Sequence, residues 1–324
     1  MSGRFKQGLL GALALLTATL VSAAPPFLAA QQSLAPGPGL PPRPDMALRV
    51  DVELVLLPVS VTDERYRAVS GLVRENFEVY EDKVRQEIAS VNEADAPVSV
   101  GLVFDGSGSM ADNIDLCKQA VRAFFQHANP EDEYFLIEFN DRPHLLVEFT
   151  SQTDRIMGFV GAARGGGSTA FYDAIYLALA QMEEARHSRK ILLVLSDGAD
   201  NHSRYSLKDV RNALRESDVQ LYTIGVFQPL PYRSTMEQEH GPALMANLAE
   251  LSGGHGFELH NPYDLPDVTA TISRELRTQY EISYHPSNRE HDGQWRKVRV
   301  KVKAPPPAPR LRARTRSGYY APFL

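Results

Sequence analysis

Cysteine is nearly absent from this chain of 324 residues, and the single Cys117 cannot form an intrachain disulfide. The zinc-binding spacing H-E-x-x-H is also missing, and the nine histidines are scattered along the chain, so we expect no zinc site. The loop Gly165–Ser168 lacks the lysine of a nucleotide-binding P-loop, and no G-x-S-x-G elbow surrounds Ser107. These absences argue against a zinc enzyme, a P-loop protein and a serine acyl-transferase.

A long membrane-spanning run is lacking as well. The apolar stretch Gly8–Val21 falls short of the roughly 20 residues that span a bilayer comfortably. It follows two basic residues and precedes the small residues Ser22–Ala24, which predicts a signal peptide over residues 1–24 and an exported protein, periplasmic or secreted. An uncleaved membrane anchor is the alternative. Residues 25–47, which are rich in Pro, Ala, Gly and Gln, are expected to form a disordered linker.

No strong excess of charge is present. The formal net charge is -6, and 43% of the residues are hydrophobic, so the chain can bury a sizeable core in more than one domain. This balance does not indicate a nucleic-acid-binding protein. Cys117 lies on the apolar face of a predicted helix, and we interpret it as a small buried hydrophobic residue.

Residues 96–286 alternate between strand and helix patterns. Strands are expected at 98–104, 134–139, 144–149, 191–195, 220–226 and 256–260, and helices at 113–127, 154–162, 171–184, 207–217, 242–251 and 265–280. This alternation predicts an α/β fold with a doubly wound, mostly parallel, Rossmann-like sheet covered on both faces. The loop Asn140–Pro143 is too short for a crossover, so residues 144–149 are predicted to form one antiparallel edge strand.

The two flanks of this region alternate with period two. Apolar and polar residues alternate along an N-terminal β segment, residues 48–95, and along a C-terminal β segment, residues 287–324. About 45 residues make a poor domain alone. We therefore expect the two flanks to pair as one small β-domain, with the α/β domain inserted between them.

Oxygen-bearing side chains follow two buried strands and one glycine-rich loop. Asp105, Ser107 and Ser109 end the first strand, Thr169 follows the sequence RGGGS, and Asp197 ends a later strand. Ligands bind at the carboxyl ends of strands in open α/β sheets, so these oxygens are expected to meet. Two carboxylates about 4–5 Å apart repel by roughly 3–4 kcal/mol at an effective dielectric constant of 20. A hard cation such as Mg²⁺ or Mn²⁺ removes that cost and keeps a position open for an acidic group.

Two other interpretations of these polar residues stay open. Aspartate and serine also cap helices at strand-to-helix junctions, which would need no metal. Asp200 and Asn201 follow Asp197 closely, and they are either part of the rim of the site or members of an ordinary polar loop.

These residues resemble the metal-ion-dependent adhesion site of von Willebrand factor type A domains, whose signature is D-x-S-x-S, then a threonine, then an aspartate after a later strand. The order and the strand context also match, over Ala96–Pro286. The flanking pieces Val59–Val91 and Tyr280–Tyr320 are similar to those of a secreted bacterial family that contains such a domain. One departure is the turn Asp82–Lys83, where such a hairpin favours Asp-Gly.

The resemblance implies an exported, non-enzymatic protein-binding module. In such a module a Mg²⁺ (or Mn²⁺) ion is held, directly or through water, by Asp105, Ser107, Ser109 and Thr169. Asp197 binds the ion through water or directly, depending on the liganded state. A partner protein supplies an Asp or Glu carboxylate. The alternatives are a metal-dependent phosphoester hydrolase and a metal-independent structural component of an envelope assembly. The nine basic residues of Arg296–Arg316 form either a solvated face or a surface for anionic polysaccharide or lipid headgroups.

Overall fold

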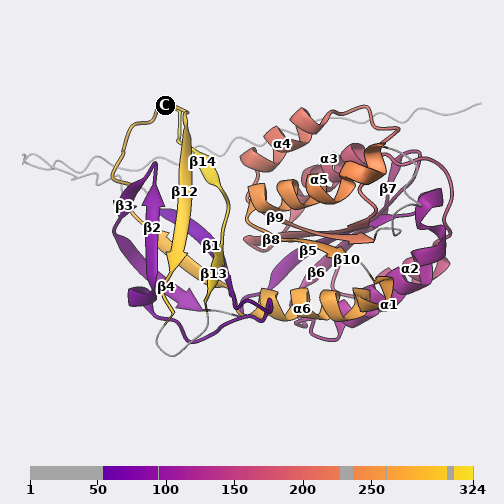
Figure 1. Ribbon diagram of the computed structural model, residues 1–324, viewed down its shortest axis with the longest axis horizontal. Coiled ribbons are helices and arrows are strands. Elements are labelled where there is room, and N and C mark those ends of the chain that lie inside the picture. Colours follow the sequence, from indigo (N-terminus) through magenta and orange to yellow (C-terminus); the bar gives the residue numbers. More distant parts are fainter. Residues whose placement is uncertain (1–53, 94, 227–235, 260, 305–309, 324) are drawn as a thin grey trace, which may run out of the picture. The chain divides into compact units, whose positions relative to one another are not determined.

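The computed structural model describes residues 54–93, 95–226, 236–259, 261–304 and 310–323 (Figure 1). The predicted signal peptide and linker, residues 1–24 and 25–47, lie outside the described residues. Within the described ranges, no helix combines the length and the apolar character needed to cross a membrane.

A six-stranded sheet forms the centre of the α/β part, in the order β10-β9-β8-β5-β6-β7. Its strands are β5 (Val98–Asp105), β6 (Glu133–Phe139), β7 (Pro143–Thr150), β8 (Arg189–Ser196), β9 (Val219–Val226) and β10 (Gly256–Leu259). All neighbours are parallel except β6 and β7, so the predicted antiparallel edge strand is confirmed. Every residue of β5 and β9 is buried, as expected for strands that are covered on both faces.

Strand β5 lies where the chain changes direction across the sheet. From β5 the chain continues to β6 and β7 on one side and later to β8, β9 and β10 on the other. Such a reversal leaves a crevice at the carboxyl ends of the two adjoining strands, which here are β5 and β8.

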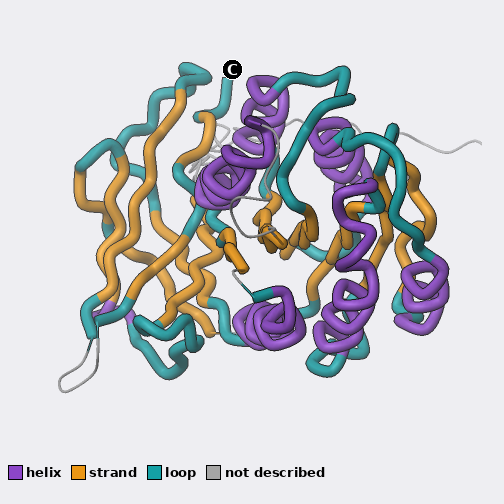
Figure 2. Tube along the Cα trace, turned by 45° about the vertical axis from the view of Figure 1, so that its right-hand side comes forward, coloured by secondary structure: helices purple, strands orange, loops and turns teal. Residues whose placement is uncertain are grey.

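Helices cover both faces of the central sheet (Figures 1 and 2). One face carries α1 (Ile114–Phe125), α2 (Thr153–Ala162) and α6 (Leu265–Arg277), and the other carries α3 (Phe171–Gln181), α4 (Leu207–Glu216) and α5 (Met236–Ser252). Short 3₁₀ turns flank them: η2 (Gly108–Asn113), η3 (Met182–Glu184) and η4 (Pro262–Asp264). Each face has its own apolar core, so the predicted fold class is confirmed.

Two helix boundaries differ from the sequence prediction. Helix α6 ends at Arg277 instead of residue 280, because Tyr280 begins a strand and is buried in another core. Helix α5 begins at Met236 and contains Pro242, which we expected to mark its start.

The flanks of the chain form two four-stranded antiparallel sheets, with the orders β13-β1-β11-β4 and β14-β12-β2-β3. Their elements are β1 (Val55–Thr62), η1 (Arg74–Asn76), β2 (Phe77–Glu81), β3 (Val84–Gln86), β4 (Ile88–Glu93), β11 (Tyr280–Tyr284), β12 (Trp295–Val302), β13 (Arg312–Arg314) and β14 (Gly318–Tyr320). Strands from before and after the α/β region pair with each other, β1 with β13 and β2 with β12. The two sheets share one apolar core.

Strand β11 shows that the C-terminal flank begins earlier than we expected. We placed the end of the α/β domain at residue 286, whereas β11 pairs with β1 and β4. Tyr280, Ile282 and Tyr284 alternate into the core of the sandwich, which explains why this segment leaves the helix.

Candidate metal centre

Asp105 ends strand β5 and is fully buried at the carboxyl edge of the central sheet. Its Oδ1 accepts a hydrogen bond from the backbone N–H of Ser107 (2.9 Å), and its Oδ2 accepts one from the Ser196 hydroxyl (2.5 Å). Ser196 is the last residue of β8, which lies beside β5. The carboxylate is therefore held on one side by its own turn and on the other by the neighbouring strand.

Ser107 and Ser109 lie in the turn that leads from β5 into η2 and α1. Ser107 is buried and Ser109 is half-buried, and their Oγ atoms are 3.1 Å apart. Each hydroxyl keeps lone pairs beyond this one hydrogen bond. Both side chains can therefore serve as neutral oxygen ligands next to Asp105.

Backbone hydrogen bonds fasten the glycine-rich loop to this turn. The N–H of Gly166 donates to the carbonyl of Gly106 (2.9 Å), and the N–H of Gly108 donates to the carbonyl of Gly167 (3.1 Å). Thr169 follows directly and is 3% exposed. The structure thus brings the turn after β5 and the threonine-bearing loop together, as the sequence predicts.

Two glycines make this close approach possible. A Cβ atom on residue 165 would lie 2.4 Å from Cα of Ala111 in η2, a distance that real side chains do not adopt. Gly167 has a φ angle of 85°, which lies in the left-handed region. Larger residues at either position would force the loop away from the turn that carries the two serines.

Asn201 fixes the backbone of Thr169 from a third segment. Its Oδ1 accepts the N–H of Thr169 (2.9 Å), and its own N–H donates to the carbonyl of Thr169 (3.0 Å). Asp200 accepts hydrogen bonds from the Tyr172 N–H (3.2 Å) and the Ser203 hydroxyl (2.5 Å). Asn201 therefore positions the threonine, whereas Asp200 stabilises the local loop.

Asp197 follows β8 and is 6% exposed, and its Oδ1 accepts the N–H of Ala199 (3.1 Å). Burial and the negative charge of Asp197 raise the pKa of Asp105 to about 7, although hydrogen bonds from Ser107 and Ser196 act in the opposite direction. In the part of the chain that the structure describes, neither aspartate forms an ion pair with a basic side chain. Among the described residues, no basic side chain therefore neutralises these two carboxylates.

The donor set fits a hard divalent cation. Two carboxylates and three hydroxyl-bearing side chains offer only oxygen, which suits Mg²⁺ or Mn²⁺. Among the described residues, no group of three or more His, Cys, Asp or Glu side chains is arranged to hold a metal ion. A metal at this site would therefore depend on hydroxyl oxygens as well as on the two aspartates.

Cys117 is buried on α1, as predicted. Burial and the nearby charge of Asp105 raise the pKa of its thiol to about 12. The thiol therefore stays protonated at neutral pH and offers no thiolate to a metal.

Sequence reasoning missed Ser196 and did not settle the role of Asn201. Ser196 ends an apolar run and immediately precedes Asp197, so the pattern alone does not separate it from the strand. The available signal was its position at the end of the strand, one residue before a predicted ligand, because polar side chains at the carboxyl ends of parallel strands lie at the edge where ligands bind.

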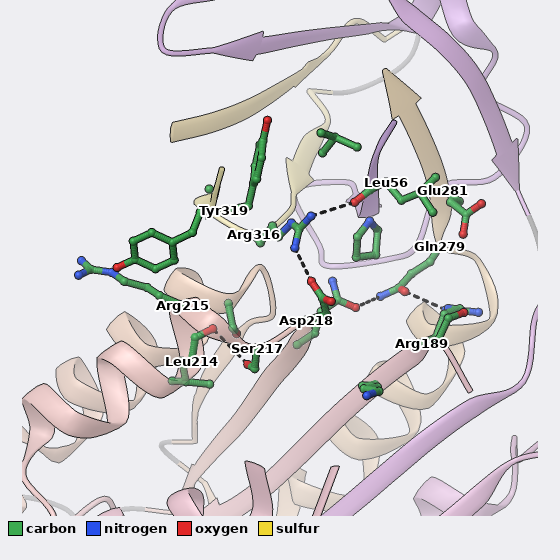
Figure 3. Close-up of a pocket in the computed structure, with 18 of the residues that line it drawn as sticks. Leu56, Arg189, Leu214, Arg215, Ser217, Asp218, Gln279, Glu281, Arg316 and Tyr319 are labelled. Atoms are coloured by element: carbon green, nitrogen blue, oxygen red, sulfur yellow. Dashed lines mark hydrogen bonds and ion pairs between the residues drawn. The ribbon is translucent and has the colours of Figure 1, made fainter. Parts of the chain in front are cut away.

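A separate cavity of about 620 Å³ lies at the amino ends of the parallel strands, between the α/β region and the β-sandwich (Figure 3). The Gln279 side chain donates to Gln220 (2.9 Å) and accepts from Arg189 (2.8 Å). Arg316 pairs with Asp218 and donates to the carbonyl of Leu56 (3.3 Å). These polar groups bind one another across the cavity, so they join the two parts of the fold.

Comparisons with known proteins agree with this architecture. The sequence model of the von Willebrand factor type A domain matches residues 99–274. No curated protein matches the chain.

Three solved structures illustrate the structural similarity. An aerotolerance-related membrane protein from Bacteroides fragilis is 16% identical, with a TM-score of 0.44 over 55% of this chain and 98% of that one. The vWF domain of the type V pili tip protein Mfa5 from Porphyromonas gingivalis is 15% identical, with a TM-score of 0.44 over 55% and 94%. A von Willebrand factor type A protein from Catenulispora acidiphila is 11% identical, with a TM-score of 0.48 over 85% and 75%. The matched family model spans more than half of the chain and coincides with the central sheet and its helices, so this chain belongs to the von Willebrand factor type A domain family.

Proposed function

We propose that this protein is an exported, non-enzymatic binding module that holds Mg²⁺ (or Mn²⁺) and uses it to bind a carboxylate of a partner protein. The ligands are Asp105, Ser107, Ser109, Thr169 and Asp197. The observation that carries the proposal is the pair of buried aspartates without a basic partner among the described residues. Buried carboxylates are costly unless a cation compensates them.

The chain's own residues prepare the site for an acidic ligand. Hydrogen bonds from Ser107 and Ser196 orient the Asp105 carboxylate, and Asn201 holds the backbone of Thr169. Three of the five ligands are neutral, so the site keeps its charge low with only two carboxylates. A bound divalent cation would supply the positive charge and an open coordination position that a partner's carboxylate can occupy.

The metal is tested by calorimetric titration of Mn²⁺ into the wild type, Asp105→Ala and Thr169→Ala. We expect no measurable binding in Asp105→Ala and about tenfold weaker binding in Thr169→Ala, because the first loses a charged ligand and the second a neutral one. Ser168→Ala is the matched control, since it removes a hydroxyl from the same loop and should bind Mn²⁺ as the wild type does. Wild-type affinity in Asp105→Ala would overturn the assignment.

Partner binding is tested by a crosslinking pull-down from envelope extract, with Mg²⁺ and again with chelator. The proposal expects protein partners that are captured only with Mg²⁺ and are lost in Thr169→Ala. Equal capture in chelator would favour the metal-independent structural component instead. Turnover of generic phosphoesters that disappears in Asp105→Ala would favour the hydrolase.

A further inference from the structure

Strand β12 presents a row of basic side chains on the outer face of the sheet β14-β12-β2-β3. Val298 and Val300 point into the sandwich core, whereas Lys297, Arg299 and Lys301 are exposed on the opposite face. Alternate residues of a strand lie about 6.7 Å apart, so the three cations form a straight line about 13 Å long. We call these three residues the β12 row.

The three residues of the β12 row have no carboxylate partner among the described residues, and they share this property with Arg310 and Arg312 but are the ones that lie on a single strand. Four of the nine are ion-paired: Arg296 with Asp292, Lys303 with Glu78, Arg314 with Glu275 and Arg316 with Asp218. Of these, the pairs of Arg314 and Arg316 join the C-terminal flank to the α/β region. The β12 row makes no such pair, so its charge is available to a ligand.

The neighbouring strand β2 does not cancel this charge. Tyr80 lies opposite Arg299, and Glu78 lies opposite Lys301. Glu78 is already bound by Lys303 (2.6 Å) and Arg85 (3.7 Å), and the hydrogen bond from Lys303 contributes most to lowering its pKa. Glu78 is therefore neutralised by cations outside the row. The other carboxylate opposite the row, that of Asp82, accepts the backbone N–H of Lys297 (3.0 Å) and forms no ion pair with the Lys297 side chain.

Aromatic rings near the row hold cations in place. The ammonium group of Lys301 lies 4.7 Å from the centroid of the Tyr80 ring, and the guanidinium of Arg215 lies 5.6 Å from that of Trp295. Cation–π contacts of this kind order long basic side chains. They also cover the rings, which therefore do not present bare platforms for stacked bases.

We propose that the β12 row binds a linear acidic polysaccharide that lies along β12. A single row of evenly spaced cations matches a chain with regularly spaced carboxylate or sulfate groups. A bilayer surface would favour cations spread across the whole face, and single-stranded nucleic acid would favour open aromatic rings. This surface lies on the β-sandwich and needs no metal, so it is independent of the function proposed above.

The test measures the binding of fluorescein-labelled polygalacturonate to the full chain by anisotropy, in EDTA and at 50 mM NaCl. The variant Lys297→Gln/Arg299→Gln/Lys301→Gln removes the row. The matched control Arg122→Gln/Arg155→Gln/Lys208→Gln removes three exposed cations from α1, α2 and α4, none of which forms an ion pair in the described chain. The charge-preserving variant Lys297→Arg/Lys301→Arg serves as a rescue, and circular dichroism verifies folding.

We expect the row variant to bind with at most about one tenth of the wild-type affinity. Its affinity should also depend less steeply on salt concentration, because fewer counterions are released on binding. The control and the charge-preserving variants should stay within about twofold of the wild type. Equal loss in row and control variants would overturn the proposal, since net charge alone would then govern binding. Tighter binding of the wild type to single-stranded DNA, or to vesicles of phosphatidylglycerol and phosphatidylcholine, than to polygalacturonate would also overturn it.

Discussion

The Ser196 hydroxyl donates a 2.5 Å hydrogen bond to Oδ2 of Asp105 across two adjacent parallel strands. The same hydroxyl accepts the backbone N–H of Gly198 (3.0 Å), so its proton is directed toward the carboxylate. This bond favours the ionised form of Asp105, whereas burial and Asp197 favour the protonated form and raise its pKa to about 7. Because the pKa of Asp105 is raised, the free energy of unfolding of the metal-free protein changes with pH through this residue.

Asp105→Asn should stabilise the protein in chelator at pH 8. The folded wild type holds a proton on Asp105 up to about pH 7, and the unfolded chain releases it near 3.8, so stability falls as pH rises between these values. Asparagine does not titrate in this range. We therefore expect the free energy of unfolding of Asp105→Asn to exceed that of the wild type by on the order of 2 kcal/mol above pH 7, and by little near pH 4. Urea unfolding across this pH range provides the measurement.

In Mg²⁺ the order of stability should reverse, so that the wild type is more stable than Asp105→Asn. The wild type gains stability with increasing Mg²⁺ by mass action, while Asp105→Asn, which lacks a charged ligand, gains little. The mechanism is wrong if the variant is less stable than the wild type in chelator at pH 8, or if both respond equally to Mg²⁺.

Ser196→Ala should weaken Mn²⁺ binding although Ser196 is not a proposed ligand. Loss of its hydrogen bond frees the Asp105 carboxylate to rotate and raises its pKa further, and groups that orient ligands commonly change metal affinity by tenfold or more. Titration calorimetry at pH 7 should show about tenfold weaker binding. A matched control is Ser99→Ala, which removes a buried hydrogen bond to Glu133 (2.6 Å) at the other end of β5. Equal Mn²⁺ affinity in the two variants would contradict a positioning role for Ser196.

The proposed ligands could be predicted from sequence because each follows a recognisable strand or loop. Asp105 and Asp197 end apolar runs, and strand ends at the reversal of an α/β sheet converge. Residues that act through another side chain leave no such mark. Ser196 belongs to the strand pattern and Asn201 to a polar loop, and their roles depend on three-dimensional contacts with Asp105 and Thr169.

The central sheet was also more predictable than the flanks. Its long buried runs alternate with amphipathic helices, whereas β11 and β14 are strands of five and three residues with few local signals. Strand β11 follows α6 after only two residues, so its pattern merges with that of the helix. Its place is decided by pairing with β1, which is more than 200 residues away in the sequence.

Lys83→Gly should stabilise the hairpin between β2 and β3. Asp82 and Lys83 both have positive φ angles, 45° and 73°, which identifies the turn type that prefers Asp-Gly. Glycine relieves the backbone strain of the left-handed conformation in the folded state, and this outweighs the conformational entropy that it adds to the unfolded chain. We therefore expect the free energy of unfolding to rise by about 0.5–1 kcal/mol. Thermal melts of Lys83→Gly and Lys83→Ala test this prediction, because alanine also removes the lysine side chain but keeps the left-handed backbone strain. No advantage of glycine over alanine would contradict this account.

The ion pair between Glu275 and Arg314 should dominate the attachment of α6 to the β-sandwich. Arg314 Nη2 lies 3.2 Å from Glu275 Oε1, and the Glu275 side chain is only 1% exposed. Tyr222 also donates to this carboxylate (3.1 Å). We expect Arg314→Met to cost about 3–5 kcal/mol, because it leaves a buried charge without its partner. Glu275→Gln/Arg314→Met should cost clearly less, since both charges are gone.

A double-mutant cycle by urea unfolding measures this coupling. The reference cycle uses Asp115 and Lys118 on α1, an ion pair at 3.1 Å whose aspartate side chain is 87% exposed, and its coupling should stay below about 0.5 kcal/mol. Limited proteolysis adds a local readout, because loosening of β13 should expose residues 310–316 to cleavage before the central sheet unfolds. Coupling energies of equal size in the two cycles would show that burial adds nothing to the Glu275–Arg314 pair, and that the β-sandwich is held to α6 by its apolar contacts instead.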